Sequence, residues 1–421
     1  MDEERSRQGT IRDGDAPSTS RKWARAPAPK ETFVARGRTA ASRWLDTRIG
    51  EALERDAVPL LALLRRLKPV VTTPRFTLVL RNDDTRDVLA DPDAFTVGLY
   101  TPKMDRILKG FALAVDDPVA HAASRAILGH AFLAGDIERL AARTATLAAE
   151  AVDGTTGLDV VGDLARPVLG TVAAEHLGIA ASDPARLAGW CQAVFRDVFL
   201  NPVGDEAVAR RADDALAALS KAAATGPPTA PDGTATVRAR LQATATLDPE
   251  AVAANLVAMA LAWVPNTLKS FPLALAELLG RPTELAAARE AALGGEDARL
   301  AGYLREALRF RPPLPGIPRL CVRDRDVGGT VIRAGTAVLA MTKSAMRDGR
   351  AVVDPRRFSP ERPLADYLNH GFGQHTCVGA AVSTAQLAAL ARPVLARAPS
   401  AAGRLRWDGP YPSRLAVRFR D

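Results

Sequence analysis

Apolar residues recur at helical spacing over most of the chain, and this pattern constrains the fold more than any other feature of the sequence. They follow it from Asp136 to about residue 222, and long helices are also expected from Pro249 to about Gly280 and from Glu296 to Arg311. Alanine and leucine are abundant, while aromatic residues make up only 5% of the chain, which favours helices over β-sandwiches. The sequence therefore predicts a mainly α-helical protein.

A few strands and one unstructured segment complete the expected organisation. Alternating residues from Arg75 to Leu80 predict a strand, and further short strands are expected at Cys321-Val322 and within Val327–Leu339. Residues 1–40 are rich in Ser, Pro, Arg and Asp without periodicity, which is typical of a disordered tail. Residues 41–421 are expected to form a single domain with small β-sheets.

Charge and cysteine content limit the class of protein. The formal net charge is +8, but the basic residues are scattered as single arginines without interleaved aromatic residues, so a solvated surface is favoured over nucleic-acid binding. A basic surface patch that binds an acidic redox partner is an alternative that the sequence leaves open. The cysteines, Cys191, Cys321 and Cys377, are too few and odd in number for a disulfide framework, which indicates a reducing compartment.

The sequence shows neither the pattern of a signal peptide nor that of a membrane span. The first residues lack the basic and then apolar pattern of a signal peptide. The longest apolar helical run, Asn255 to Trp263, is expected to be broken by Pro265 and Asn266, well short of a membrane span. The sequence therefore predicts a cytoplasmic protein with no membrane span.

The most informative segment surrounds the last cysteine, in the stretch His370-Gly-Phe-Gly-Gln-His-Thr-Cys-Val-Gly379. Its two glycines before Cys377 allow the backbone to bend tightly and to approach a flat ligand. The cysteine then opens a predicted helix, where free N–H groups stabilise a thiolate. Such a sulfur is a strong axial ligand for haem iron.

This segment resembles the cysteine loop of the cytochrome P-450 superfamily, Phe-Gly-x-Gly-x-His/Arg-x-Cys-x-Gly. Every fixed position matches except the first, where His370 stands in place of the phenylalanine that shields the sulfur. The resemblance implies a triangular helical prism, with haem b between a long distal helix and the cysteine-bearing helix. It also implies that Cys377 is the iron ligand and that Phe372, Gly373 and Gly379 contact the haem.

A second match is Glu306-Ala-Leu-Arg309, whose charged side chains lie three residues apart on one helix face. In the family it resembles, this pair is joined by an arginine from a Phe-x-Pro-x-Arg segment, here ending at Arg362. The resemblance implies a structural role for all three residues.

Haem also carries two carboxylates that need cations or hydrogen-bond donors, and arginine suits such groups. The residues that match the family's carboxylate-binding positions are His121, Arg125, Arg319 and His375. The first two are four residues apart on one expected helix face.

The distal helix departs from the family pattern. Monooxygenases of this type usually carry Ala-Gly-x-Asp/Glu-Thr-Thr, which aligns with Ala262-Trp-Val-Pro-Asn-Thr267 here. The proline is expected to kink the helix, and Trp263 to narrow the space above the haem. Asn266 does not titrate and so cannot relay protons as the acid and hydroxyl do, although Thr267 could substitute if the register shifts by one. Trp263, Asn266 and Thr267 are thus the catalytic candidates, against the plain alternative of an ordinary helix break.

Three functions follow from these matches. The first is a monooxygenase that takes electrons from a ferredoxin or flavoprotein and oxidises a small apolar substrate, because the loops near 97–111 and 194–202 are apolar. The second is a peroxide-using enzyme, such as a fatty-acid hydroperoxide isomerase, a dehydratase or a peroxygenase, which would explain Pro265 and Asn266. The third is a catalytically silent haem-binding protein.

Overall fold

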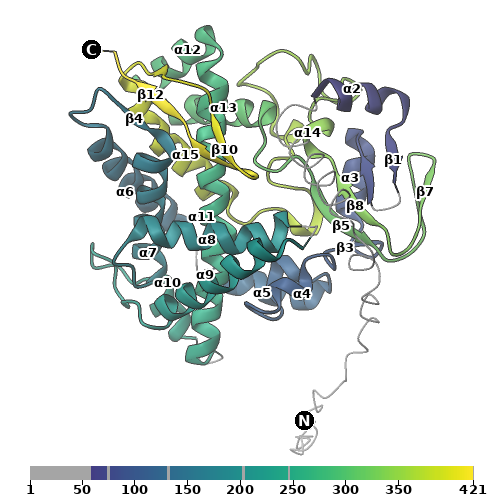
Figure 1. Cartoon of the computed structure of the whole chain (residues 1–421), viewed down its shortest axis with the longest axis horizontal. Coiled ribbons are helices and arrows are strands. Elements are labelled where there is room, and N and C mark those ends of the chain that lie inside the picture. Colours follow the sequence, from purple (N-terminus) through teal and green to yellow (C-terminus); the bar gives the residue numbers. More distant parts are fainter. Residues whose placement is uncertain (1–57, 74–75, 130–132, 202–203, 245–246, 421) are drawn as a thin grey trace, which may run out of the picture.

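The computed structural model describes residues 58–73, 76–129, 133–201, 204–244 and 247–420. The disordered tail predicted for residues 1–40, and the beginning of the domain predicted from residue 41, lie outside the described residues. Helices form the larger part of the molecule, and the largest sheet lies at one side with α2, α3 and α14 (Figure 1).

Helices account for most of the described elements. In chain order they are α2 (Val58–Leu67), α3 (Asn82–Ala90), α4 (Thr101–Met104), α5 (Pro118–Gly129), α6 (Ala134–Val152), α7 (Arg166–Leu177), α8 (Pro184–Leu200), α9 (Glu206–Ala224), α10 (Val237–Gln242), α11 (Pro249–Leu279), α12 (Pro282–Leu293), α13 (Asp297–Phe310), α14 (Thr342–Ala345) and α15 (Ala380–Ala396). Shorter helical turns are η1 (Ala112–Ala114), η2 (Val160–Ala165), η3 (Leu364–Asp366) and η4 (Gly373–His375).

The strands are short and form small sheets. They are β1 (Val70–Thr72), β2 (Phe76–Val79), β3 (Phe95–Thr96), β4 (Gly157–Asp159), β5 (Ile317–Cys321), β6 (Arg325–Val327), β7 (Thr330–Ile332), β8 (Ala337–Ala340), β9 (Ser400–Ala401), β10 (Arg406–Asp408), β11 (Tyr411–Arg414) and β12 (Ala416–Arg418). The largest sheet has five strands in the order β1-β2-β8-β5-β3, with only β2 and β8 parallel. It joins the amino-terminal segment to the region after residue 316, which are far apart in sequence.

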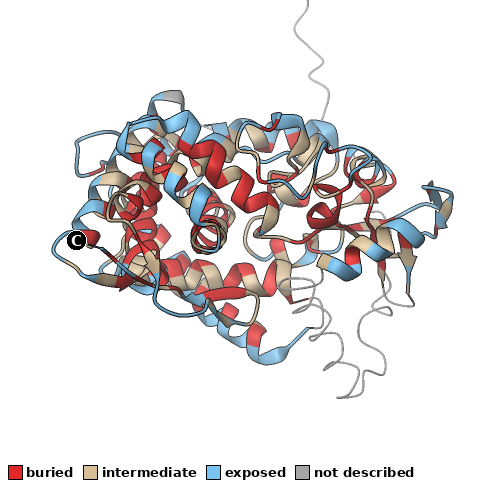
Figure 2. Ribbon diagram, turned by 90° about the horizontal axis from the view of Figure 1, so that it is seen from above, coloured by how far each residue is buried: buried red, intermediate tan, exposed pale blue. Residues whose placement is uncertain are grey.

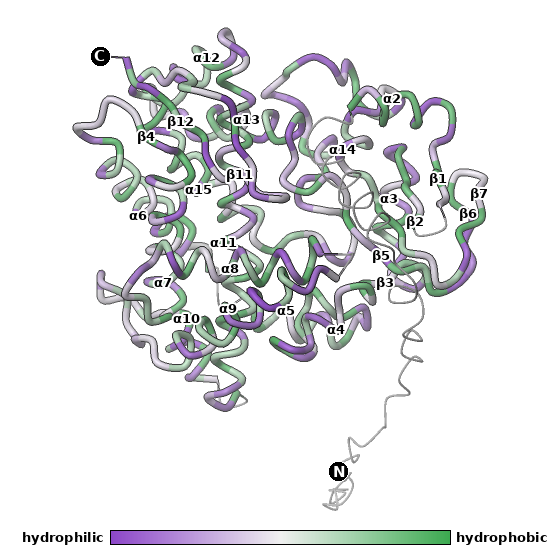
Figure 3. The backbone as a smooth tube through the Cα atoms, viewed as in Figure 1, coloured by the Kyte–Doolittle hydropathy of each residue, from purple (hydrophilic) through white to green (hydrophobic). Residues whose placement is uncertain are grey.

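Helix α11 is the central element of the helical part. It packs against α7, α8, α9, α13 and α15. Buried residues are concentrated in the interior of the molecule, and exposed residues lie at its periphery (Figure 2). All residues from Leu256 to Leu261 are buried. Hydropathy changes along the surrounding helices as they turn from core to solvent (Figure 3), as expected for amphipathic helices around a core.

Among the described helices, α11 is the one long and apolar enough to cross a membrane. However, 72% of its most apolar window is buried inside the protein. Its apolar surface is therefore covered by neighbouring helices, which identifies it as the core helix of this fold.

The expected break of α11 at Pro265 and Asn266 is wrong, because the helix continues through both residues and through Pro272. Proline removes one backbone hydrogen bond, but packing on several sides holds the helix together. Nearby hydroxyls also donate to backbone carbonyls four residues earlier: Thr267 Oγ1 to Trp263 O at 3.3 Å and Ser270 Oγ to Asn266 O at 2.7 Å.

Candidate functional site

The loop before α15 positions Cys377. Gly371 and Gly373 have φ angles of +76° and +73°, a region that favours glycine. A Cβ on Gly373 would lie 2.5 Å from the carbonyl oxygen of Leu89, so no larger residue fits against the end of α3. The Cys377 N–H donates to the His370 carbonyl at 2.9 Å, which closes the loop and directs the thiol.

Cys377 was expected to be the first residue of a helix, and the structure differs on this point. Helix α15 begins at Ala380, with Gly379 as its N-cap, so Cys377 precedes the first helical turn. Cys377 is exposed to solvent, yet the protein around it removes enough water for burial to raise the pKa of its thiol. The Gly379 N–H and the charge of Arg125 act in the opposite direction with smaller effect.

Two histidines meet beside this loop. The rings of His121 on α5 and His375 on η4 lie edge to face, with centroids 4.9 Å apart. Arg125, one turn after His121, donates to the Thr376 carbonyl at 2.8 Å. Burial, and then the charges of His375 and Arg125, lower the pKa of His121. The structure thus brings three of the four predicted carboxylate-binding residues together, in a positively charged environment.

The fourth residue, Arg319, lies on β5 with only 2% of its surface exposed. Its charge acts on the buried phenol of Tyr100, on which Asp116 acts with opposite sign. Burial is the larger effect and raises the pKa of Tyr100 to about 12. Asp116 in turn faces His375, with 3.2 Å between Oδ1 and Nε2. Arg319 therefore lies near enough to the Tyr100 phenol for its charge to act on it, while its guanidinium donates to the Pro318 carbonyl at 2.9 Å.

These residues fit a haem. The His375 Nδ1 is buried and has no hydrogen-bond partner in the part of the chain that the structure describes, and such atoms normally have one. Two histidines and two arginines suit the two carboxylates of the group, and the exposed thiol of Cys377 suits its iron.

Phe372 was expected to contact the haem, and His370 stands where the family has a phenylalanine, but the contacts of both lie mainly with other parts of the protein. The Phe372 ring lies 4.6 Å from the Arg86 guanidinium and packs against buried residues including Met346, which is a packing role. The imidazole of His370 is partly buried, and burial, followed by the charge of Arg305, lowers its pKa, so the ring is neutral at pH 7.

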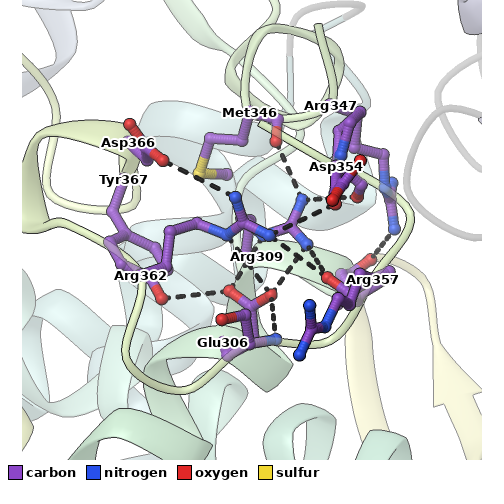
Figure 4. Close-up of polar contacts among 12 residues, drawn as sticks. Glu306, Arg309, Met346, Arg347, Asp354, Arg357, Arg362, Asp366 and Tyr367 are labelled. Atoms are coloured by element: carbon purple, nitrogen blue, oxygen red, sulfur yellow. Dashed lines mark hydrogen bonds and ion pairs between the residues drawn. The ribbon is translucent and has the colours of Figure 1, made fainter. Parts of the chain in front are cut away.

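Glu306 and Arg309 form a fully buried pair on α13 (Figure 4). Two hydrogen bonds of 2.9 and 2.8 Å join their side chains. Arg362 approaches Glu306 at 3.5 Å, and the Tyr367 hydroxyl donates to it at 3.0 Å. Burial, and then the negative charge of Glu306, raise the pKa of Tyr367.

This buried pair also holds the chain that leads to the cysteine loop. Arg309 donates to the backbone carbonyls of Met346, Pro355 and Arg357, and Glu306 accepts the Ser359 N–H at 2.9 Å. Each polar group of the pair thus has a partner, which is what a buried ion pair requires.

The middle of α11 has one stripe that solvent reaches. From Val257 to Phe271 the helix is buried except for Ala262 and Asn266, which are partly exposed. They are four residues apart and therefore share a face, and the Asn266 amide donates to the Ala262 carbonyl at 2.8 Å. Thr267, in contrast, is 1% exposed.

The expectation that Trp263 narrows the space above a haem does not fit its position. Its indole N–H donates to Gln386 of α15 at 2.6 Å, and its ring packs edge to face on His176 of α7. The side chain therefore points into the core between helices, a direction that its sequence neighbours do not reveal.

Asp116 is the polar residue that sequence reasoning missed. It precedes Asp117, whose carboxylate caps α5 by accepting the Ala120 N–H at 2.8 Å. One aspartate suffices for a cap. The presence of a second acid in Asp116-Asp117-Pro118 was therefore the sequence feature that could have indicated another role for Asp116.

The fold and the cysteine loop are shared with known proteins. The family model described as Cytochrome P450 matches residues 300–397. Cytochrome P450 monooxygenase PikC of Streptomyces venezuelae is 29% identical, over 90% of this chain and 93% of that protein. Cytochrome P450-SU2 of Streptomyces griseolus is 29% identical, over 76% and 80%. The solved structure of cytochrome P450 TbtJ1 superimposes with a TM-score of 0.73 at 24% identity, covering 88% of this chain and 98% of that one.

The family match covers α13, the buried Glu306–Arg309 pair and the cysteine loop. The curated relatives extend the agreement over most of the chain, and the solved structure extends it to the fold. The chain belongs to the cytochrome P450 superfamily and is an oxidoreductase of the haem-thiolate monooxygenase type.

Proposed function

We propose that this protein binds haem b through Cys377 and inserts one oxygen atom of dioxygen into a small apolar substrate in the cytoplasm. One observation supports this most: a solvent-accessible cysteine on a glycine-bounded loop, beside a cluster of histidines and arginines with an unpaired buried Nδ1 among the described residues. A thiolate-ligated haem, when bound, supplies electron transfer and the activation of dioxygen.

The residues divide into two groups by role. Cys377 would supply the sulfur that binds the haem iron, with the Gly379 N–H beside it. The carboxylate-binding group would fix the orientation of the ring, and its members are His121, Arg125, Arg319 and His375. The side chains of Arg125, Arg319 and His375 are already held by neighbours in the protein, which lowers the entropic cost of binding.

Asn266 would act on the distal side. It is the polar residue of the accessible stripe on α11, and an amide both donates and accepts hydrogen bonds without titrating. Asn266 would therefore orient a water molecule or the substrate. Thr267 is buried and donates to the Trp263 carbonyl, and Trp263 is bound to Gln386, so neither would act in this way.

An apolar substrate is supported by the aromatic residues where two predicted pocket segments meet. The Phe199 ring of α8 lies 4.9 Å from Tyr100 and 4.6 Å from Phe195, between ring centroids. Such clusters favour apolar ligands. A ferredoxin or flavoprotein would deliver the electrons.

A comparison of oxidants tests the proposal. Purified protein reconstituted with haem is reduced under carbon monoxide, and its absorption spectrum reports thiolate ligation. Substrate screening then compares two arms: dioxygen with reductant and a surrogate ferredoxin system, and hydrogen peroxide or a fatty-acid hydroperoxide without reductant. The proposal predicts the thiolate spectrum and products only in the first arm, with labelled dioxygen providing the inserted atom.

The other outcomes identify the alternatives. Products in the peroxide arm alone would establish the peroxide-using function, which Pro265 and Asn266 first suggested. A thiolate spectrum without products or substrate-induced spectral shifts would establish a silent haem protein. The curated relatives lend support to neither alternative.

A further inference from the structure

Asp116 links three parts of the site that are distant in sequence. It lies just before α5, with its side chain 22% exposed. Its carboxylate accepts the Val97 N–H, at 3.2 Å to Oδ1 and 3.0 Å to Oδ2. The same Oδ1 lies 3.2 Å from His375 Nε2, and its backbone carbonyl accepts the Gln374 amide at 2.9 Å.

These contacts determine how the imidazole of His375 is oriented. A ring that donates through Nε2 has only Nδ1 left for another partner, and Nδ1 donates to a carboxylate in the ring form that carries a proton on both nitrogens. That atom is the buried nitrogen that lacks a partner in the described residues. Because Gln374 is bound to the same aspartate, both the ring and its backbone are held against the start of α5.

The charge of Asp116 is unexpected at this place. A carboxylate beside the binding site of two other carboxylates weakens their binding by repulsion unless it provides something else. The cations and donors of the carboxylate-binding group allow the cluster to tolerate one additional anion. What Asp116 adds is orientation, as outer carboxylates do for histidines that bind metals.

We propose that Asp116 is a positioning residue that orients His375 toward a haem carboxylate and ties the Val97–Tyr100 turn to the cysteine loop. The inference rests on the proposed haem site and goes beyond it, because it assigns a role to a residue outside the carboxylate-binding group, whose contacts are with Val97, Gln374 and His375. The aspartate joins the segment predicted to line the substrate pocket to the segment that holds the cysteine.

The test compares Asp116→Asn and Asp116→Ala with wild type in haem-replete protein. Haem transfer to excess apomyoglobin is followed by absorption, and the reduction potential is measured by dye titration. Loss of an orienting outer partner typically weakens binding about 10- to 100-fold, so transfer is expected to be about tenfold faster or more. Because a negative charge is removed, the potential is expected to become more positive, while the carbon monoxide spectrum keeps its thiolate form.

Asp117→Asn is the matched control. Its carboxylate caps the same helix and is exposed, so the variant reports general weakening of α5 without touching His375. Wild-type rates and potential are expected for it. Asp116 variants that release haem within about twofold of the wild-type rate, well below the effect expected for an outer partner, or an equal effect in Asp117→Asn, would overturn the role of Asp116. A wild-type chain that binds no haem would overturn the proposed function as well.

Discussion

At the residue scale, the segment that leads to the cysteine loop is held by a buried ion pair whose polar groups are all hydrogen-bonded. Glu306 and Arg309 are 0% exposed and contact backbone and side-chain groups of the segment that leads to the cysteine loop. Removing one member of such a pair leaves the other charged and uncompensated. The pair is therefore a structural element whose loss extends to the loop that holds Cys377.

Glu306→Gln is expected to lower the free energy of unfolding by about 3–5 kcal/mol, because the buried guanidinium loses its counter-charge. Chemical denaturation followed by circular dichroism measures the change. The control is Glu206→Gln, which removes an exposed pair with Arg210 at 3.4 Å and should leave stability unchanged within error. Equal losses in both variants would show that the buried pair has no special role.

At the element scale, α11 and α15 are joined by a buried polar chain. Trp263 donates to Gln386 at 2.6 Å, and the Gln386 amide donates to Thr144 of α6 at 3.3 Å. Gln386 and Thr144 are both 0% exposed. The chain fixes the rotation of α11 about its axis, and this rotation places Ala262 and Asn266 on the accessible side.

Trp263→Phe is expected to cost about 1–3 kcal/mol of stability, since it leaves a buried Gln386 oxygen without its donor. If α11 becomes less rigid, the distal residues are held less precisely, and the haem absorption band that shifts on substrate binding is expected to become broader. Denaturation and optical titration measure the two effects. Trp190→Phe, on the partly exposed face of α8, is the control. If it destabilises the protein as much as Trp263→Phe does, the buried chain does not explain the loss.

At the scale of the whole molecule, the candidate haem site exists only because distant segments meet. His121, Arg319 and Cys377 come from a helix, a strand and a loop that are far apart in sequence. The thiol of Cys377 is exposed, and the Nδ1 of His375 has no partner among the described residues. A ligand that binds this arrangement and not the unfolded chain stabilises the folded state by mass action.

Removal of haem is therefore expected to lower the unfolding temperature, and stoichiometric haem should restore it. At a ligand concentration of about 1,000 times Kd, the stabilisation is about 4 kcal/mol. Scanning calorimetry of haem-free, haem-replete and reconstituted protein measures it. Cys377→Ala serves as the comparison and should recover only part of the gain. A haem-free chain that melts at the haem-replete temperature would contradict the idea that haem completes this fold.

Features that depend on neighbours in the sequence were predictable. The glycines before Cys377, the placement of Glu306 and Arg309 on one helix face, and the start of α11 at Pro249 all follow from local rules of backbone freedom, helical spacing and capping. The resemblance to one superfamily added the carboxylate-binding residues, and the structure brings His121, Arg125 and His375 together although their segments are far apart.

What only the tertiary structure decided concerns direction and environment. No local rule states that α11 passes through Pro265 unbroken, that Trp263 faces Gln386, or that Asp116 meets His375. A helix fixes the angles between its own side chains, but packing partners elsewhere in the chain fix its rotation and depth. The sequence by itself therefore determined the cysteine loop and the class of fold, whereas long-range packing determined which side chains face the site.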